Sequence, residues 1–174
     1  MKRKLTGKEK LYTVLLIIIQ TVISIFVANK TLTESLAQQG LEGGEFPGLP
    51  SYTMTATTTV VSILGILLGA LILFWFLSLL KSEGNYSYGL ILFIDLLSSL
   101  PWIVIHAILT FILSVDRMLQ FAGVFDLVGA IITSSLLAFL LYKYEVASKK
   151  KTVIFAVVII VLNLLMTLAS TALA

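Results

Sequence analysis

The 174-residue sequence has no cysteine and only one histidine, and these two absences exclude several classes of protein. Without cysteine the chain can form neither a disulfide nor a thiolate metal site. A single histidine cannot supply the His-Glu-x-x-His ligands of a zinc protease. We therefore expect no bound metal and no cofactor.

Motifs of other enzyme classes are also missing. The sequence has no Gly-x-Ser-x-Gly elbow of a serine hydrolase and no Gly-x-x-x-x-Gly-Lys loop of an ATPase. A lipid phosphatase would need clustered arginine and histidine, whereas Arg3 and Arg117 are the only arginines. We predict that the chain is not an enzyme.

Charge is scarce, and long apolar runs take its place. Charged residues make up 12% of the chain, against about one quarter in an average soluble domain. A hydrocarbon core about 30 Å thick needs about 20 apolar residues per helix, and spanning segments without alternating polarity are helices. The sequence therefore predicts an all-α polytopic membrane protein, a five-helix transmembrane bundle forming one domain over residues 1–174. The predicted spans are residues 11–28, 56–80, 89–114, 122–142 and 152–173.

The basic residues indicate the orientation of the bundle. Ten of the 12 lysines and arginines precede the first span or lie in the connections after the second and fourth spans, while Lys30 and Arg117 fall in the other two connections. This bias predicts a cytoplasmic amino terminus and an external carboxyl terminus. The short loops favour a bacterial plasma membrane. The same residues would contact anionic lipid headgroups, so we expect the lipid bilayer and not nucleic acid as their partner.

The only sizeable connection is predicted over residues 29–55, outside the membrane. Residues 31–41 have the leucine spacing of a short amphipathic helix, and a glycine- and proline-rich stretch over residues 43–50 would end it. Two interpretations stay open. The segment is either an interfacial linker or a cap that binds a partner.

Three ionisable residues fall inside the predicted spans, where a charge costs several kcal/mol and indicates a candidate site. Asp95 and His106 lie on one stripe of the third span together with Ser99 and Trp102, and this stripe should face the bundle. Asp95 is too far along the helix to reach His106. His106 and Asp126 lie at similar depth on antiparallel helices, so we expect them to pair. The pair is either a proton-sensitive or ion-binding site or a structural hydrogen bond.

Pro101 lies in the middle of the third span, where proline removes a backbone hydrogen bond and can bend a helix. Ser98 and Ser99 directly precede it and are expected to bond the carbonyl groups that the proline frees. These three residues form a candidate hinge, or a kink used only for packing.

Small and amide residues predict contacts between helices. Gly65 and Gly69 form a Gly-x-x-x-Gly pair in the second span, which permits close helix packing or dimerisation. Gln20 and Asn163 lie near the middle of the first and fifth spans, and both amides are expected to hydrogen-bond across helices.

Three segments of the later half resemble the Yip-one domain family, the Ypt-interacting membrane proteins. Residues 88–101, YGLILFIDLLSSLP, are similar to that family's polar entry into a central span ending in Leu-Pro. Residues 124–130, VFDLVGA, and 148–151, SKKK, look like its Phe-Asp-leading helix and the basic turn before its closing helix. The resemblance covers roughly residues 84–173, and Pro101, Phe125 and Asp126 match positions that the family pattern emphasises.

The resemblance implies a non-catalytic accessory protein. Eukaryotic members carry a long cytoplasmic amino-terminal region used with Rab GTPases, whereas only about ten residues precede the first span here. The compact form is similar to bacterial members, which the family links to the export of antimicrobial peptides beside ABC transporters or to resistance against them. Other membrane subunits are therefore the expected partners.

Two rival interpretations stay open. One is a transporter subunit resembling the vitamin-capturing components of energy-coupling-factor transporters, although these usually have six spans and an Ala-x-x-x-Ala motif that the first span lacks. The other is a stand-alone immunity or stress protein of the membrane. A bound small ligand would favour the first, and the absence of both ligand and partner would favour the second.

Overall fold

The structure, a computed structural model, describes residues 5–38, 51–79 and 86–173. These residues form six helices, of which the fourth is a single short segment between two long ones. In chain order the helices are α1 (Gly7–Gln38), α2 (Ser51–Leu79), α3 (Tyr88–Ile112), α4 (Val115–Gln120), α5 (Ala122–Lys143) and α6 (Lys149–Leu173).

Local side chains and turns set the ends of several helices. Thr6 and Glu9 form a capping box at the start of α1, in which each side chain accepts a hydrogen bond from the other residue's backbone N–H. The hydroxyl of Ser87 accepts from the N–H of Leu90 at the start of α3. At the end of α5, Glu145 has a positive φ of 56°, and the N–H of Val146 donates to the carbonyl of Leu141 as in a Schellman turn.

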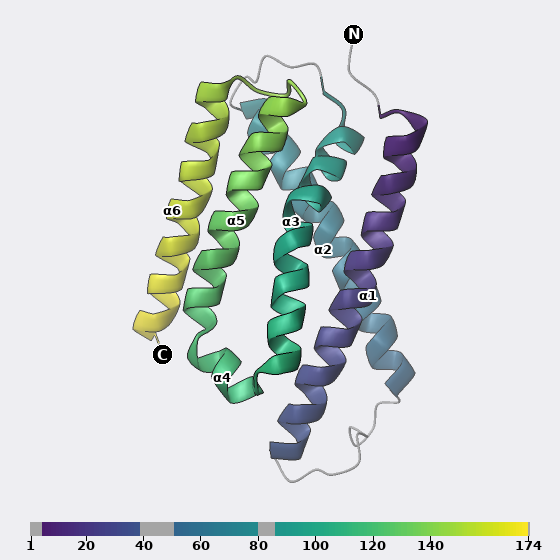
Figure 1. Ribbon diagram of the computed structural model, residues 1–174, viewed down its shortest axis with the longest axis vertical. Coiled ribbons are helices and arrows are strands. Elements are labelled where there is room, and N and C mark those ends of the chain that lie inside the picture. Colours follow the sequence, from purple (N-terminus) through teal and green to yellow (C-terminus); the bar gives the residue numbers. More distant parts are fainter. Residues whose placement is uncertain (1–4, 39–50, 80–85, 174) are drawn as a thin grey trace.

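The long helices pack as a bundle with α2 across its back. Figure 1 shows α1, α3, α5 and α6 standing side by side, while α2 crosses behind α3 from the α5 side toward the far end of α1. Helix α1 packs against α2 and α3, α3 packs against α2 and α5, and α5 packs against α6. The start of α1 and the end of α6 lie at opposite ends of this bundle (Figure 1).

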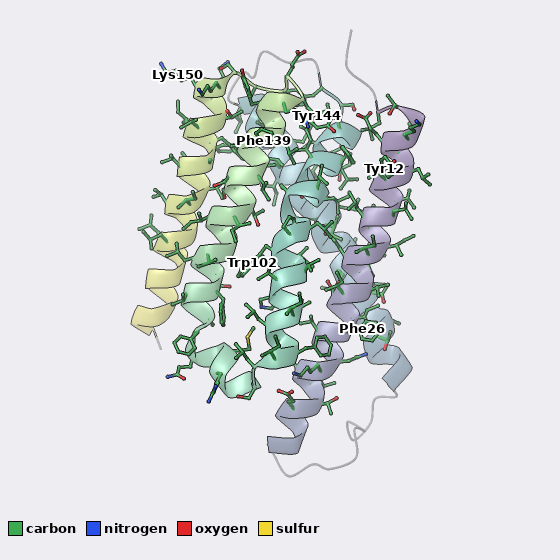
Figure 2. All side chains as sticks on the ribbon, viewed as in Figure 1. Tyr12, Phe26, Trp102, Phe139, Tyr144 and Lys150 are labelled. Atoms are coloured by element: carbon green, nitrogen blue, oxygen red, sulfur yellow. The ribbon has the colours of Figure 1, made fainter. Side chains whose placement is uncertain are left out.

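The tightly packed core occupies one half of the bundle. Its fully buried side chains come from the end of α2, the first turns of α3, the end of α5 and the turn into α6. They include Leu77, Leu90, Ile91, Ile94, Leu96, Leu141 and Val146. This is the end at which α6 begins and where Figure 2 shows Lys150. The other half, around the end of α3 and the start of α5, contains few fully buried side chains among the described residues.

The exterior of the bundle is apolar, as lipid requires. Large hydrophobic side chains such as Ile72, Trp75 and Phe111 are more than half exposed. The four helices α1, α2, α3 and α5 are long and apolar enough to cross a membrane. The prediction of an all-helical membrane protein is thus confirmed for these four.

The first two helices extend beyond the apolar spans that the sequence predicts. Helix α1 continues to Gln38, so the short helix expected over residues 31–41 is in its described part the end of α1. Helix α2 begins at Ser51 instead of residue 56. Hydropathy marks only the apolar part of a helix, whereas the helical backbone continues through its polar ends. Near the start of α2 the hydroxyl of Thr59 is itself bonded to the helix, since it donates to the carbonyl of Thr55. Residues 39–50 of the predicted connection lie outside the described residues.

Candidate functional site within the membrane helices

Gln20 makes the hydrogen bonds between helices that its position in the sequence predicted. Its side chain is 3% exposed, and Nε2 donates to the carbonyl of Leu96 at 2.9 Å and to the hydroxyl of Ser99 at 3.0 Å. Both acceptors belong to α3, so one amide of α1 ties the two helices together. The corresponding expectation for Asn163 concerns a side chain outside the part that the structure describes.

The two serines before Pro101 bond to the backbone, but not at the carbonyl that we expected. The proline ring lacks the N–H that would otherwise donate to the carbonyl of Leu97. Ser98 and Ser99 instead donate to the carbonyl of Asp95 at 2.9 and 3.0 Å. A serine in a helix reaches back three or four residues, so these hydroxyls meet carbonyls one position or more before Leu97. Figure 1 shows that α3 changes direction along its length.

Lys30 links α1 to the far end of α3. Its ammonium group donates to the backbone carbonyl of Thr110, forms an ion pair with Glu34 at 3.1 Å and lies 5.3 Å from the ring centroid of Phe111. The hydroxyl of Thr110 donates in turn to the carbonyl of His106 at 2.8 Å. A cation near the last carbonyls of a helix is favoured by the helix dipole. The sequence had placed Lys30 in a loop, whereas it lies within α1.

His106 and Asp126 line the same cavity of about 200 Å³ at this end of the bundle. Its walls also include Thr31 of α1 and Met118 of α4. Among the described residues, the structure shows no direct hydrogen bond or ion pair between the imidazole and the carboxylate. His106 is partly buried, but Asp126 is exposed in the second turn of α5, so it does not face the interior as we expected. Equal depth brings the two residues to one cavity, while the rotation of α5 leaves Asp126 at its rim.

Asp95 lines a second cavity, of about 280 Å³, bounded by α2, α5 and α6. The other side chains around it are apolar and include Leu73, Leu137 and Ile159. Within the described residues, no hydrogen bond or ion pair reaches the Asp95 carboxylate, because the nearby serines bond to its backbone carbonyl instead. The side chain is partly buried. The Asp95 carboxylate thus lies among apolar side chains.

Close helix packing occurs at Gly129, a residue that the sequence analysis did not single out. A Cβ built on Gly129 would lie 2.4 Å from Cε2 and Nε1 of Trp102, so the indole ring rests directly on the backbone of α5. Figure 2 shows Trp102 between α3 and α5. The predicted Gly65 and Gly69 pair behaves differently. Within the described part of the chain, nothing lies within 4 Å of a Cβ at Gly65, and a Cβ at Gly69 would meet only the Asp95 carboxylate at 3.8 Å.

Comparison with protein families shows to which family this chain of membrane helices belongs. The family model of the Yip1 domain matches residues 1–171 of the 174-residue chain. The chain belongs to the Yip1 domain family. The match includes α1 and α2 as well as the later half, in which the sequence motifs resemble the family. Searches of curated proteins and of solved structures gave no match.

The Yip1 family match and the four long apolar helices together show a multi-pass membrane protein. Of the residues on which the resemblance rested, Pro101 lies in the middle of α3 and is exposed, while Phe125 and Asp126 both line the cavity that contains His106. In the described residues no group of three or more metal-ligating side chains comes together.

Proposed function

We propose that this Yip1 family protein is a non-catalytic accessory subunit that binds another integral membrane protein, with an ABC-type exporter of antimicrobial peptides as the class of partner. The observation that carries the proposal is the match to the Yip1 domain over residues 1–171. The compact bacterial form that the sequence resembles is linked to such exporters or to resistance against the peptides.

The use of polar side chains within the membrane supports a structural role. Gln20, Ser98, Ser99 and Thr110 all donate to backbone carbonyls of α3. Only the Gln20 bond joins two helices, and interhelical bonds of this kind contribute about 0.6 kcal/mol on average in membrane proteins. The other three are local bonds within α3. All four satisfy polar side chains inside the bundle, which is a structural use.

A vitamin-capturing subunit is less well supported. Sites for small molecules usually enclose about 300–1,000 Å³ and bury most of the ligand. The cavity of His106 and Asp126 measures about 200 Å³, and that of Asp95 measures about 280 Å³ and is an open groove, so neither would enclose a vitamin. Family membership also favours the accessory role over this rival.

The proposal includes five crossings, with the amino terminus in the cytoplasm of a bacterial cell. Helix α6 has 25 residues, about 37 Å at 1.5 Å per residue, which is enough to cross the hydrocarbon core. An odd number of crossings agrees with the positions of the start of α1 and the end of α6 at opposite ends of the bundle (Figure 1). The lysines at the proposed cytoplasmic end are Lys8, Lys10, Lys143, Lys149, Lys150 and Lys151.

Purification of the tagged chain in mild detergent, from the cell that carries its gene, tests the partner. We expect an ABC-type permease and ATPase to co-purify in a fixed ratio, while an unrelated tagged multi-pass protein from the same membrane recovers neither. A chain that purifies alone with a small molecule would support the vitamin-capturing rival instead.

A genetic experiment separates an accessory subunit from a stand-alone immunity protein. Cells lacking the chain, the exporter or both are challenged with the exported peptide. If the chain acts through the exporter, the double deletion is no more sensitive than the exporter deletion. Additive sensitivity would contradict the proposal and favour the stand-alone protein.

A further inference from the structure

The cavity that contains Asp95 is a groove between two helices that diverge. Phe76 of α2 and Phe155 of α6 are in contact, with ring centroids 5.4 Å apart, and they close the groove near the lysine-rich end. From there α2 crosses behind α3 toward the far end of α1, whereas α6 stays beside α5 (Figure 1). The Asp95 side chain of α3 is a wall of this groove.

The groove has a regular apolar lining on both sides. Helix α2 contributes residues at positions i, i+3, i+4 and i+7, and α6 does the same, so each wall is about 10 Å long. These lining residues are Gly69, Ile72, Leu73 and Phe76 of α2 and Phe155, Val158, Ile159 and Leu162 of α6. No lysine, arginine or histidine is among the described residues that line the groove.

Gly69 leaves the Asp95 carboxylate open to the groove. A Cβ at Gly69 would lie 3.8 Å from Oδ2 of Asp95, so the absence of a side chain there keeps space in front of the carboxylate. Gly69 itself is exposed, so the groove is open at this point and the carboxylate can be approached past it.

We propose that this groove binds a lipophilic monovalent cation, an organic ammonium or phosphonium compound that enters from the lipid and places its charge beside Asp95. A carboxylate within the hydrocarbon region is costly unless an opposite charge or a proton neutralises it, and the described walls supply no positive charge. The apolar walls match the apolar part of such a cation. This inference goes beyond the accessory role and does not depend on it.

Binding of tetraphenylphosphonium to the full chain in nanodiscs of phosphatidylcholine tests the proposal. Equilibrium dialysis against empty nanodiscs separates binding from partition into lipid. Tetraphenylborate, which has nearly the same shape and the opposite charge, is the matched control ligand. We expect saturable binding of the phosphonium at one site per chain and no saturable binding of the borate.

Two variants address the charge and the space in front of it. Asp95→Asn keeps the shape of the side chain but removes its charge, and Gly69→Leu keeps the charge but fills the groove. We expect each to weaken phosphonium binding about tenfold or more, equivalent to about 1.4 kcal/mol. The control variants are Gly65→Leu, one turn earlier on α2 with nothing within 4 Å, and Glu145→Gln, which removes an exposed carboxylate.

The pattern over the four variants decides the outcome. Full affinity in Gly65→Leu and Glu145→Gln, with loss in the other two, supports the groove as the site. Unchanged affinity in Asp95→Asn overturns the proposal. Saturable borate binding that Gly69→Leu abolishes also overturns it, because the groove would then bind an apolar ion whatever the sign of its charge. Absence of saturable phosphonium binding to the unmodified chain overturns it too. Circular dichroism of each variant verifies that the helices are retained.

Discussion

Substitution of Gly129 by alanine should destabilise the contact between α3 and α5. The added methyl group would lie 2.4 Å from the Trp102 ring, about 1 Å inside ordinary van der Waals contact. The indole is a large rigid group, so either its rotamer or the spacing of the two helices must change. Overpacking of this kind costs about 1–3 kcal/mol.

A second alanine variant isolates this cost. Replacing glycine by alanine within a helix also contributes up to about 1 kcal/mol of stability through helix propensity. Gly65→Ala should show that gain alone, because its Cβ meets nothing within 4 Å. The two variants should therefore differ in free energy of unfolding by about 1–3 kcal/mol, with Gly129→Ala the less stable.

Unfolding in mixed micelles with increasing dodecyl sulfate, followed by far-ultraviolet circular dichroism, measures both variants. The chain has two tryptophans, so in a Trp75→Phe background the fluorescence reports on Trp102 alone. A Trp102→Leu substitution should remove most of the penalty of Gly129→Ala in a double-mutant cycle. Equal stability of the two alanine variants, or a penalty that persists without the tryptophan, would refute the packing argument.

Four further predictions concern the polar residues and the orientation. Gln20→Leu should lower stability by about 0.6–1.7 kcal/mol through loss of its bonds to α3, measured by the same unfolding assay, and an unchanged midpoint would contradict this role. Since the chain has no cysteine, single cysteines introduced at Ser35 and Ser148 can report the membrane topology. On intact cells an impermeant thiol reagent should label only Ser35→Cys, and the reverse pattern would invert the proposed orientation. Asp126→Ala and Asp126→Asn should have equal effects in the same unfolding assay, because Asp126 is exposed and has no hydrogen bond to His106 among the described residues; a larger loss of stability in the alanine variant would contradict this placement. Pro101→Ala should leave the protein inserted and straighten α3, which increases the distance between spin labels at the two ends of the helix; an unchanged distance would exclude the hinge.

Fold class could be predicted from the sequence because lipid leaves few choices. Every backbone amide within the hydrocarbon needs a partner, so a long apolar run is a helix whatever its neighbours are. The same reasoning could not locate the helix ends. Lys30 looks like a loop residue by hydropathy, yet it lies within α1, and its ammonium group bonds a carbonyl near the end of α3.

The candidate site was predictable in depth but not in rotation about the helix axes. The rise of 1.5 Å per residue fixes how far along a helix each side chain lies, and His106 and Asp126, expected at similar depth, line one cavity. Which side of α5 faces α3 depends on packing at Gly129, and a lone glycine gives little signal in the sequence. Gly65 and Gly69 carry the better-known pattern but do not meet a neighbouring helix backbone.

Different helix pairs in this bundle are held together by different interactions, and the Asp95 side chain takes part in none of the three described next. Helix α1 is tied to α3 by the amide of Gln20, and α2 is tied to α3 by the Tyr88 hydroxyl, which donates to the carbonyl of Leu67 at 2.8 Å. Helix α5 meets α3 through the shape of Trp102 on Gly129. None of these contacts uses the Asp95 carboxylate. A conservative change at Asp95 should therefore leave the three helix pairs intact, so that an effect on cation binding can be assigned to the lost charge.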